Sequence, residues 1–438
     1  MRCLLCIIAI WLLNGCALAF PDKIHYSLLD RQDVFADEAQ TNAVAPIVSE
    51  GETIIGIALS GGGSRASVFG AASLEVLAEA GILQQATYIS SVSGGGFPAA
   101  YYAIHKPQPC ADASRPGERP CTSEDYATFK KTMRHNFLND MTLRQIVRPS
   151  RVTSPTRRLI SLQDALENKI TKDATFADLP AAPILLINGA RYDDGRRFVF
   201  SNLAIPEEEG SDLARFSHPA LRTASFSLPG CSRAVPGDFS VALAIGISAG
   251  FPPLLGPASI ALPADCDGGP PRYWHLGDGG ILENTGVETI EDFATRAMKM
   301  RDPKAAAGGR VLIFSIDAGR STPADQMMQT RSLNLWRTDP GRVVEIAGMR
   351  ARGYRAVTLQ QTRDESPVKI DVITMKYTDA QLTSWPASCG RKTPDPAAIK
   401  AKLVAVPTNL KITKCDADLM EHAARDVVTR NLVAHGFL

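Results

Sequence analysis

Ser93 is the residue whose surroundings point most directly to chemistry. It stands in Ser91-Val92-Ser93-Gly94-Gly95, directly after a short apolar run and directly before a helical pattern. A serine on such a tight strand-to-helix turn is lifted clear of a sheet, beside a helix N-terminus that stabilises negative charge. The segment departs from the G-x-S-x-G pattern, because Ser91 replaces the first glycine. Alone, it is also typical of a serine that caps a helix, so it indicates a nucleophile only together with other features.

Three successive glycines form the second segment, Gly61-Gly62-Gly63-Ser64-Arg65. Glycines after a strand leave their backbone N–H groups unshielded, and such a nest can hold an oxyanion or a phosphate. No Lys-Ser/Thr pair follows as in a P-loop, and the dinucleotide spacing G-x-G-x-x-G is not met. We therefore favour an oxyanion loop over a nucleotide site. Arg65 could pair with a substrate phosphate or with a carboxylate of the protein.

An aspartate between glycines forms the third segment, Leu276-Gly277-Asp278-Gly279-Gly280. A short apolar run at 273–276 precedes it, so Asp278 is expected at the end of a strand, where its carboxylate can reach across the top of a sheet. A plain Asp-Gly turn is the alternative interpretation of this segment alone.

The elements around the first two segments predict how they are held. Residues 53–60 form a β-branched apolar run typical of a buried parallel strand, and 66–81 read as a helix closed by Gly81. The same order follows at once, with a strand at 86–92 and a helix at 94–105. Two strand–turn–helix units in sequence indicate a parallel sheet with crossover helices.

The remaining patterns extend this architecture. Residues 183–201 read as two strands joined at Asp194-Gly195, a recognisable hairpin turn. Further strands are expected at 309–319 and 368–377, and helices at 286–300, about 340–355 and 417–435. The sequence therefore predicts one α/β domain over 53–438, a three-layer α/β/α fold with a mostly parallel central sheet. Polar, basic residues 106–160 are expected to be an insertion packed over the sheet.

The order of the three segments resembles the patatin-like phospholipase family, in which a glycine loop with a basic residue precedes a serine elbow and a distant Asp-Gly-Gly. Residues 175–201 and the segment ALAIGISAGFPPLL at 242–255 also resemble the family. The resemblance covers most of 53–290 and is weaker over 106–160 and 320–438. Two further departures are Ala66, where the family often has glycine, and Asn284-Thr285, where it often has Asn-Pro.

The resemblance implies a lipid acyl hydrolase of the phospholipase A or lysophospholipase type. It implies a catalytic dyad of Ser93 as nucleophile and Asp278 as its base, and an oxyanion hole from Gly61, Gly62, Gly63 and Gly94. Arg65 would face a substrate phosphate, and no cofactor or metal ion is expected. The expected partner is a lipid ester, met at a membrane surface; lipid class, sn-position and chain length stay open. Burial of Asp278 is expected to raise its pKa, which would make it a better base near neutrality.

Two other functions stay open. An α/β-hydrolase with a Ser-His-Asp triad needs a histidine late in the chain, and His422 and His435 are candidates, although both fall in a helical pattern. His275 lies three residues before Asp278, which in a strand places it on the opposite face, so we expect it in packing. The second alternative is a lipid-binding protein that keeps the fold without the chemistry.

Composition and the N-terminus bound the class of protein. The chain has 438 residues with Lys+Arg 47 against Asp+Glu 46, which gives no electrostatic case for nucleic acid, and no protein partner can be inferred. Arg2 and an apolar run at 3–13 predict a signal peptide over 1–19, with an uncleaved anchor as the alternative, followed by a connection over 20–52. The segment around Cys16 also resembles a lipoprotein box. Export is therefore predicted, to the periplasm, the medium or the outer membrane.

Cysteine spacing agrees with export. Six of the nine cysteines lie outside the leader, an even number typical of disulfides in an exported chain. The simplest pairing is local: Cys110–Cys121, Cys231–Cys266 and Cys389–Cys415. No spacing suits a zinc site. The apolar stretch 252–262 is expected to be either a lid or interfacial patch, or a loop folded onto the core.

Overall fold

The computed structural model of the chain describes most residues from Thr53 to the C-terminus. The described residues are 53–109, 123–201, 223–225, 239–252, 255–261, 273–301, 309–320, 353, 357, 360, 363–364, 368–391 and 393–438. The predictions for 1–52 and for Cys110, Cys121, Cys231 and Cys266 lie outside these residues, and so does nearly all of the helix expected at 340–355.

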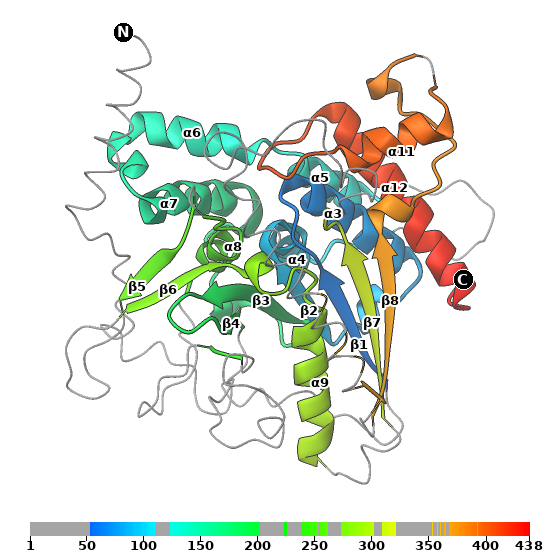
Figure 1. The fold of residues 1–438 in the computed structure, drawn as a ribbon, viewed down its shortest axis with the longest axis horizontal. Coiled ribbons are helices and arrows are strands. Elements are labelled where there is room, and N and C mark those ends of the chain that lie inside the picture. Colours follow the sequence, from blue (N-terminus) through cyan, green and yellow to red (C-terminus); the bar gives the residue numbers. More distant parts are fainter. Residues whose placement is uncertain are drawn as a thin grey trace.

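A mixed sheet of eight strands lies at the centre of the described residues (Figure 1). The strands are β1 (Thr53–Leu59), β2 (Tyr88–Val92), β3 (Ile184–Arg191), β4 (Arg197–Phe200), β5 (Ala258–Ala261), β6 (Tyr273–Asp278), β7 (Arg310–Asp317) and β8 (Lys369–Lys376). They pair in the order β5-β6-β3-β2-β1-β7-β8, with β4 also paired to β3. The pairs from β3 through β2, β1 and β7 to β8 are parallel, and those that involve β4, β5 or β6 are antiparallel. The predicted mostly parallel sheet is confirmed.

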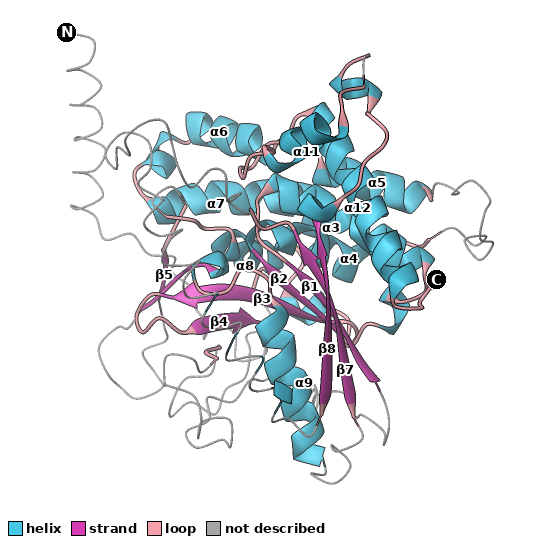
Figure 2. Ribbon diagram, turned by 45° about the vertical axis from the view of Figure 1, so that its right-hand side comes forward, coloured by secondary structure: helices cyan, strands magenta, loops and turns pink. Residues whose placement is uncertain are grey.

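Helices cover both faces of this sheet. The α-helices of the described residues are α3 (Ser64–Glu79), α4 (Gly96–His105), α5 (Glu124–Met133), α6 (Phe137–Val147), α7 (Pro155–Leu166), α8 (Val241–Ser248), α9 (Val287–Arg301), α11 (Pro396–Val404) and α12 (Lys414–Ala434). The helix α9 covers one face, and α3, α4, α8 and α12 lie on the other (Figure 2).

Alternation along β1 explains why both faces carry helices. Ile54 and Ala58 belong to the apolar cluster under α9, whereas Ile57 and Leu59 belong to the larger cluster on the opposite face. Successive side chains of a strand point to opposite faces, so a strand that is apolar throughout has to be covered on both sides. The predicted three-layer α/β/α fold is confirmed.

The described part of the insertion at 106–160 lies over the helices that cover the sheet. Its described part contains α5, α6 and the start of α7, and α5 packs on α3 and α4, which already cover the sheet. Phe129 stacks on Tyr101 of α4, with ring centroids 4.4 Å apart, and the Ser67 hydroxyl of α3 contacts the sulfur of Met133 at 3.1 Å. The insertion thus thickens the helical layer.

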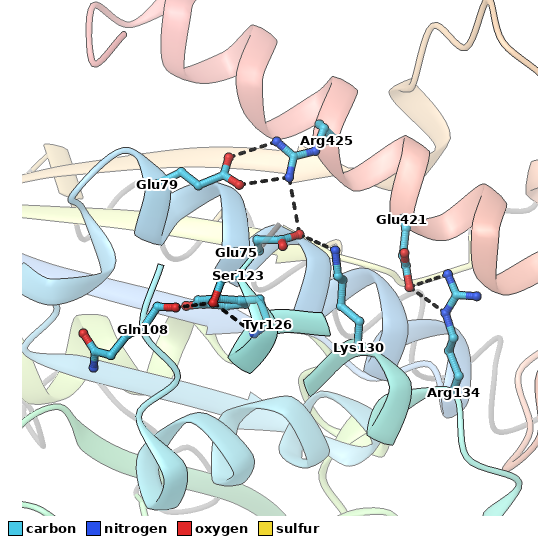
Figure 3. Close-up of polar contacts among 9 residues, drawn as sticks. All are labelled: Glu75, Glu79, Gln108, Ser123, Tyr126, Lys130, Arg134, Glu421 and Arg425. Atoms are coloured by element: carbon cyan, nitrogen blue, oxygen red, sulfur yellow. Dashed lines mark hydrogen bonds and ion pairs between the residues drawn. The ribbon is translucent and has the colours of Figure 1, made fainter. Parts of the chain in front are cut away.

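Ion pairs centred on the buried Glu75 join three of these helices (Figure 3). Glu75 of α3 is buried and accepts from Lys130 Nζ of α5 at 2.7 Å and from Arg425 of α12 at 3.4 Å. The same Arg425 contacts both carboxylate oxygens of Glu79, at 2.9 and 3.0 Å. A carboxylate removed from water needs such partners, so these contacts hold α3, α5 and α12 in one arrangement.

Two further sequence predictions can be compared with the structure. Cys389 and Cys415 are joined by a disulfide, as predicted. Within the stretch 252–262, Ala258–Ala261 is strand β5, paired antiparallel with β6, so this part is neither lid nor loop. Among the described residues, no helix combines the length and apolar character needed to cross a membrane.

Candidate active site

The ends of β2 and β6 meet on one edge of β3. Val92, the last residue of β2, pairs with Asn188, and Asp278, the last residue of β6, pairs with the next residue, Gly189. The hairpin strand β4 occupies the other edge of β3 at both positions. The strands β2 and β6 therefore share an edge and run toward each other along it. Ser93 directly follows β2, so this register brings it to Asp278.

The backbone of Ser93 turns sharply between β2 and α4. Its φ is +51°, in the left-handed region that residues other than glycine seldom adopt. The Ser93 N–H donates to Ser248 Oγ at 2.8 Å, and the Ser93 hydroxyl donates to Asp278 Oδ2 at 3.1 Å. The predicted tight turn is therefore present, and its side chain faces the carboxylate.

Burial controls the acidity of Asp278. The residue is 5% exposed, and its Oδ1 accepts from the Gly280 N–H at 2.7 Å. Removal from water raises the pKa of this carboxyl to about 7, although the Gly280 N–H and the Ser93 hydroxyl both favour the charged form. A carboxylate with this pKa can accept a proton near neutral pH.

The glycine loop offers two backbone donors. The Gly61 N–H donates to the carbonyl of Asn284 at 2.9 Å. The N–H groups of Gly62 and Gly63 have no acceptor among the described residues. This corrects the expectation for Gly61, whose N–H is already engaged, and leaves the N–H groups of Gly62, Gly63 and Gly94 as the candidate oxyanion donors.

Close backbone contacts join the glycine loop to the serine turn. A Cβ added to Gly94 would lie 2.6 Å from Gly63 N and 2.2 Å from Gly63 O, so only glycine fits at 94. A Cβ added to Gly61 would lie 3.3 Å from Ser93 Cβ. The loop therefore borders the serine, as the prediction of an oxyanion loop requires.

Arg65 is placed differently from the expectation. It is 1% exposed, and its guanidinium donates to the carbonyls of Ala318 at 2.9 Å and Val406 at 2.8 Å. Its Cζ also lies 5.2 Å from the ring centroid of Tyr377. The predicted contact with a substrate phosphate is therefore corrected: Arg65 fastens the start of α3 to distant parts of the chain.

Ser248, at the last residue of α8, is a site residue that the sequence analysis did not single out. Its Oγ accepts from the Ser93 N–H and donates to the Asn188 carbonyl at 2.5 Å. It thus links the serine turn to the residue of β3 opposite Val92. A serine in an Ala- and Gly-rich helix reads as a packing residue, and only its place in segment 242–255 hinted at a role.

No histidine among the described residues hydrogen-bonds Ser93 or Asp278. His422 Nδ1 lies 3.5 Å from Ser384 Oγ, and His435 Nδ1 lies 2.8 Å from the Asn431 carbonyl. The His275 ring, expected in packing, is 45% exposed and contacts Asp193 Oδ1 at 2.6 Å. His105 and His135 contact Ile170 and Asp140, respectively. The described chain therefore brings a serine and a carboxylate together without a histidine between them.

Comparison with known families identifies the chain. Residues 57–290 match the family model described as patatin-like phospholipase, and this span is more than half of the 438 residues. The chain belongs to the patatin-like phospholipase family. The predicted resemblance is confirmed, and the matched span contains the glycine loop, Ser93 and Asp278.

Several solved structures are similar to this patatin-like chain. Human GIVD cytosolic phospholipase A2 aligns with a TM-score of 0.46 and 12% identity, over 97% of this chain and 62% of that chain. Its complex with methyl gamma-linolenyl fluorophosphonate and terbium chloride aligns with a TM-score of 0.45 and 13% identity, over 91% of this chain and 62% of that chain. VipD from Legionella pneumophila aligns with a TM-score of 0.30 and 12% identity, over 88% of this chain and 67% of that chain. The chain thus spans less than two thirds of the cytosolic phospholipase A2. No curated protein is significantly similar to it in sequence.

Proposed function

We propose that this chain is a serine hydrolase of lipid esters, of the phospholipase A or lysophospholipase type, with Ser93 as nucleophile and Asp278 as base. The observation that carries the proposal is the 3.1 Å hydrogen bond from the Ser93 hydroxyl to Asp278 Oδ2. The raised pKa of that carboxyl, about 7, supports its role as a base. Membership of the patatin-like phospholipase family supports a lipid substrate.

Acylation would begin with attack by Ser93 Oγ on the acyl carbonyl carbon, as Asp278 takes the hydroxyl proton. The negative charge then forms on the former carbonyl oxygen. The N–H groups of Gly62 and Gly63 are suited to hold that charge, and the N-terminus of α4 next to Ser93 adds a favourable dipole. Collapse of the intermediate breaks the ester C–O bond, and the departing alkoxide takes the proton back from Asp278.

Deacylation would repeat these roles with water. Asp278, again ionised, takes a proton from a water molecule that attacks the acyl-Ser93 carbonyl. The second intermediate collapses with release of the fatty acid, and the proton on Asp278 returns to Ser93 Oγ. One carboxylate is thus base in each attack and acid in each collapse.

The test measures fatty-acid release from phosphatidylcholine, lysophosphatidylcholine and diacylglycerol. We expect Ser93→Ala and Asp278→Asn each to lower kcat by roughly 10⁴ or more, as expected for loss of a nucleophile or of its base. Ser384→Ala, at an exposed serine, is the matched control and should keep full activity. Unchanged release by either site variant would contradict the dyad.

Covalent labelling separates the remaining functions. A fluorophosphonate probe should form an adduct on Ser93 in the wild type and none in Ser93→Ala. Absence of the adduct, with lipid binding retained, would indicate a non-catalytic lipid-binding protein. Loss of activity in His275→Ala, His422→Ala or His435→Ala as large as in Ser93→Ala would indicate a triad instead.

A further inference from the structure

The helix α6 presents apolar side chains to solvent on one face. Leu143, Ile146 and Val147 are 61%, 68% and 71% exposed. Their spacing of i, i+3 and i+4 places them side by side on the helix, while Phe137 and Met141 are buried and hold it to the protein. Single exposed apolar residues are ordinary, but three adjacent ones on one helix form a patch that indicates a contact surface.

Arginines lie within this segment and directly after it along the chain. Residues 141–163 contain no aspartate or glutamate and five arginines: Arg144, Arg148, Arg151, Arg157 and Arg158. The carboxylates that flank this stretch are Asp140 of α6, which contacts His135 at 2.9 Å, and Asp164, which contacts Arg144 at 3.5 Å and Arg151 at 2.5 Å. The chain as a whole has a net charge of +1, so positive charge is concentrated here. An apolar helix face bordered by arginines fits the headgroup region of an anionic lipid surface.

The patch belongs to the same end of the molecule as the candidate site. The Leu138 N–H of α6 donates to the Leu410 carbonyl at 3.1 Å, and the Ser64 N–H, directly after the glycine loop, donates to the Asn409 carbonyl at 2.7 Å. Adjacent residues of one segment therefore contact both α6 and the glycine loop. Figure 1 shows α6 at the end toward which β7 and β8 point.

Another exposed apolar side chain, outside α6, lies close to the candidate site along the chain. Phe251 is partly exposed and follows Ser248, which holds the Ser93 N–H, by three residues. An exposed apolar side chain therefore also follows the residue that accepts from the Ser93 N–H.

We propose that α6 docks the protein on the surface of an anionic lipid bilayer. Leu143, Ile146 and Val147 enter the boundary between headgroups and acyl chains, and Arg148 contacts lipid phosphates. This inference rests on the proposed function, since it names the surface on which the lipid ester is met. Docking through α6 would bring the glycine loop and Ser93 next to the headgroups.

Vesicle binding tests the proposal independently of hydrolysis. The full chain carrying Ser93→Ala is sedimented with vesicles of equal parts phosphatidylcholine and phosphatidylglycerol, and with vesicles of phosphatidylcholine alone. We expect stronger binding to the anionic vesicles, weakened by added salt. Adding Leu143→Gln, Ile146→Gln and Val147→Gln together should weaken binding roughly tenfold, and Arg148→Glu about fivefold. Val433→Gln, at a residue of α12 that is 57% exposed, is the matched control and should bind as before.

Three outcomes would contradict the proposal. Unchanged vesicle binding by the triple variant, or equal binding to both kinds of vesicle, would overturn it. A dimer that the triple variant converts to a monomer would show that a second copy covers the face instead. With Ser93 intact, the triple variant should still hydrolyse a soluble short-chain ester, which shows that it folds. If the wild type cleaves no ester, the proposed function fails while the binding result stands.

Discussion

At the scale of single residues, the site depends on the protonation of Asp278. Its pKa is raised to about 7 because the carboxyl is removed from water, so the charged form that can accept the Ser93 proton accumulates only as the pH rises through 7. We expect kcat/KM to increase roughly tenfold per pH unit below that value and to level off above it. Initial rates on a soluble ester from pH 4 to 9 measure this. A flat profile would contradict Asp278 as base.

The hydroxyl of Ser248 is expected to position the nucleophile. Ser248→Ala removes both the acceptor for the Ser93 N–H and the donor to the Asn188 carbonyl. The strained turn at Ser93 then loses a support, and we expect kcat to fall about tenfold or more with KM unchanged, as for a small displacement of a reacting group. The rate of fluorophosphonate labelling should fall in parallel.

A second buried serine provides the matched control for Ser248. Ser161 of α7 is fully buried, and its hydroxyl has no hydrogen-bond partner among the residues that the structure describes. Ser161→Ala should leave kcat and the labelling rate unchanged. If both variants lowered kcat equally, the effect of Ser248→Ala would be one of packing and not of positioning.

At the scale of elements, the site exists because two strands end at neighbouring positions of a third. The strand β2 arrives along one edge of β3 in parallel, and β6 arrives along the same edge antiparallel, so their last residues face Asn188 and Gly189. Neither strand contains both reacting groups. The register of β3 with its two neighbours therefore sets the distance between Ser93 and Asp278.

Contact between the serine turn and the glycine loop is the second feature at this scale. Gly94→Ala would place a Cβ within 2.6 Å of the Gly63 backbone, which has to shift. We expect the donors of the loop to be displaced and kcat to fall by roughly 10²–10³, the cost of losing one oxyanion donor. Gly246→Ala in α8 is the control, because the nearest atom to its added Cβ is 3.6 Å away. Full activity in Gly94→Ala would mean that the loop does not act on the oxyanion.

At the scale of the whole molecule, burial of Asp278 should lower stability. The folded state keeps this proton up to about pH 7, whereas an unfolded aspartate releases it near pH 4, so the free energy of unfolding falls as the pH rises between these values. Asp278→Asn cannot release a proton. The free energy of unfolding of Asp278→Asn minus that of the wild type should therefore increase between pH 4 and pH 8, by up to about 4 kcal/mol. Urea unfolding of both proteins at the two pH values measures the difference. An equal difference at both would contradict the raised pKa.

Several features were determined by the sequence alone because their signals are local. The apolar runs of β1, β2, β7 and β8 and the turn at Gly195, where φ is +73°, depend on neighbouring residues only. The same holds for the serine turn. The order of the three glycine-flanked segments was enough to predict the family, which residues 57–290 then confirmed.

Other features were decided by contacts between residues far apart in the chain. Ser93 and Asp278 are separated by 185 positions, and only the pairing of β2 and β6 with β3 brings them within 3.1 Å. Arg65 and Gly61 do not have their predicted roles, because their N–H groups donate to carbonyls more than two hundred residues away in the chain. The sequence by itself indicated Ser93, Asp278 and the glycine loop as candidate groups, and it predicted the strands that precede them. Only the tertiary structure decided which backbone N–H groups of the loop lack a protein acceptor and how far the pKa of Asp278 is raised. Both depend on contacts with residues far away in the chain.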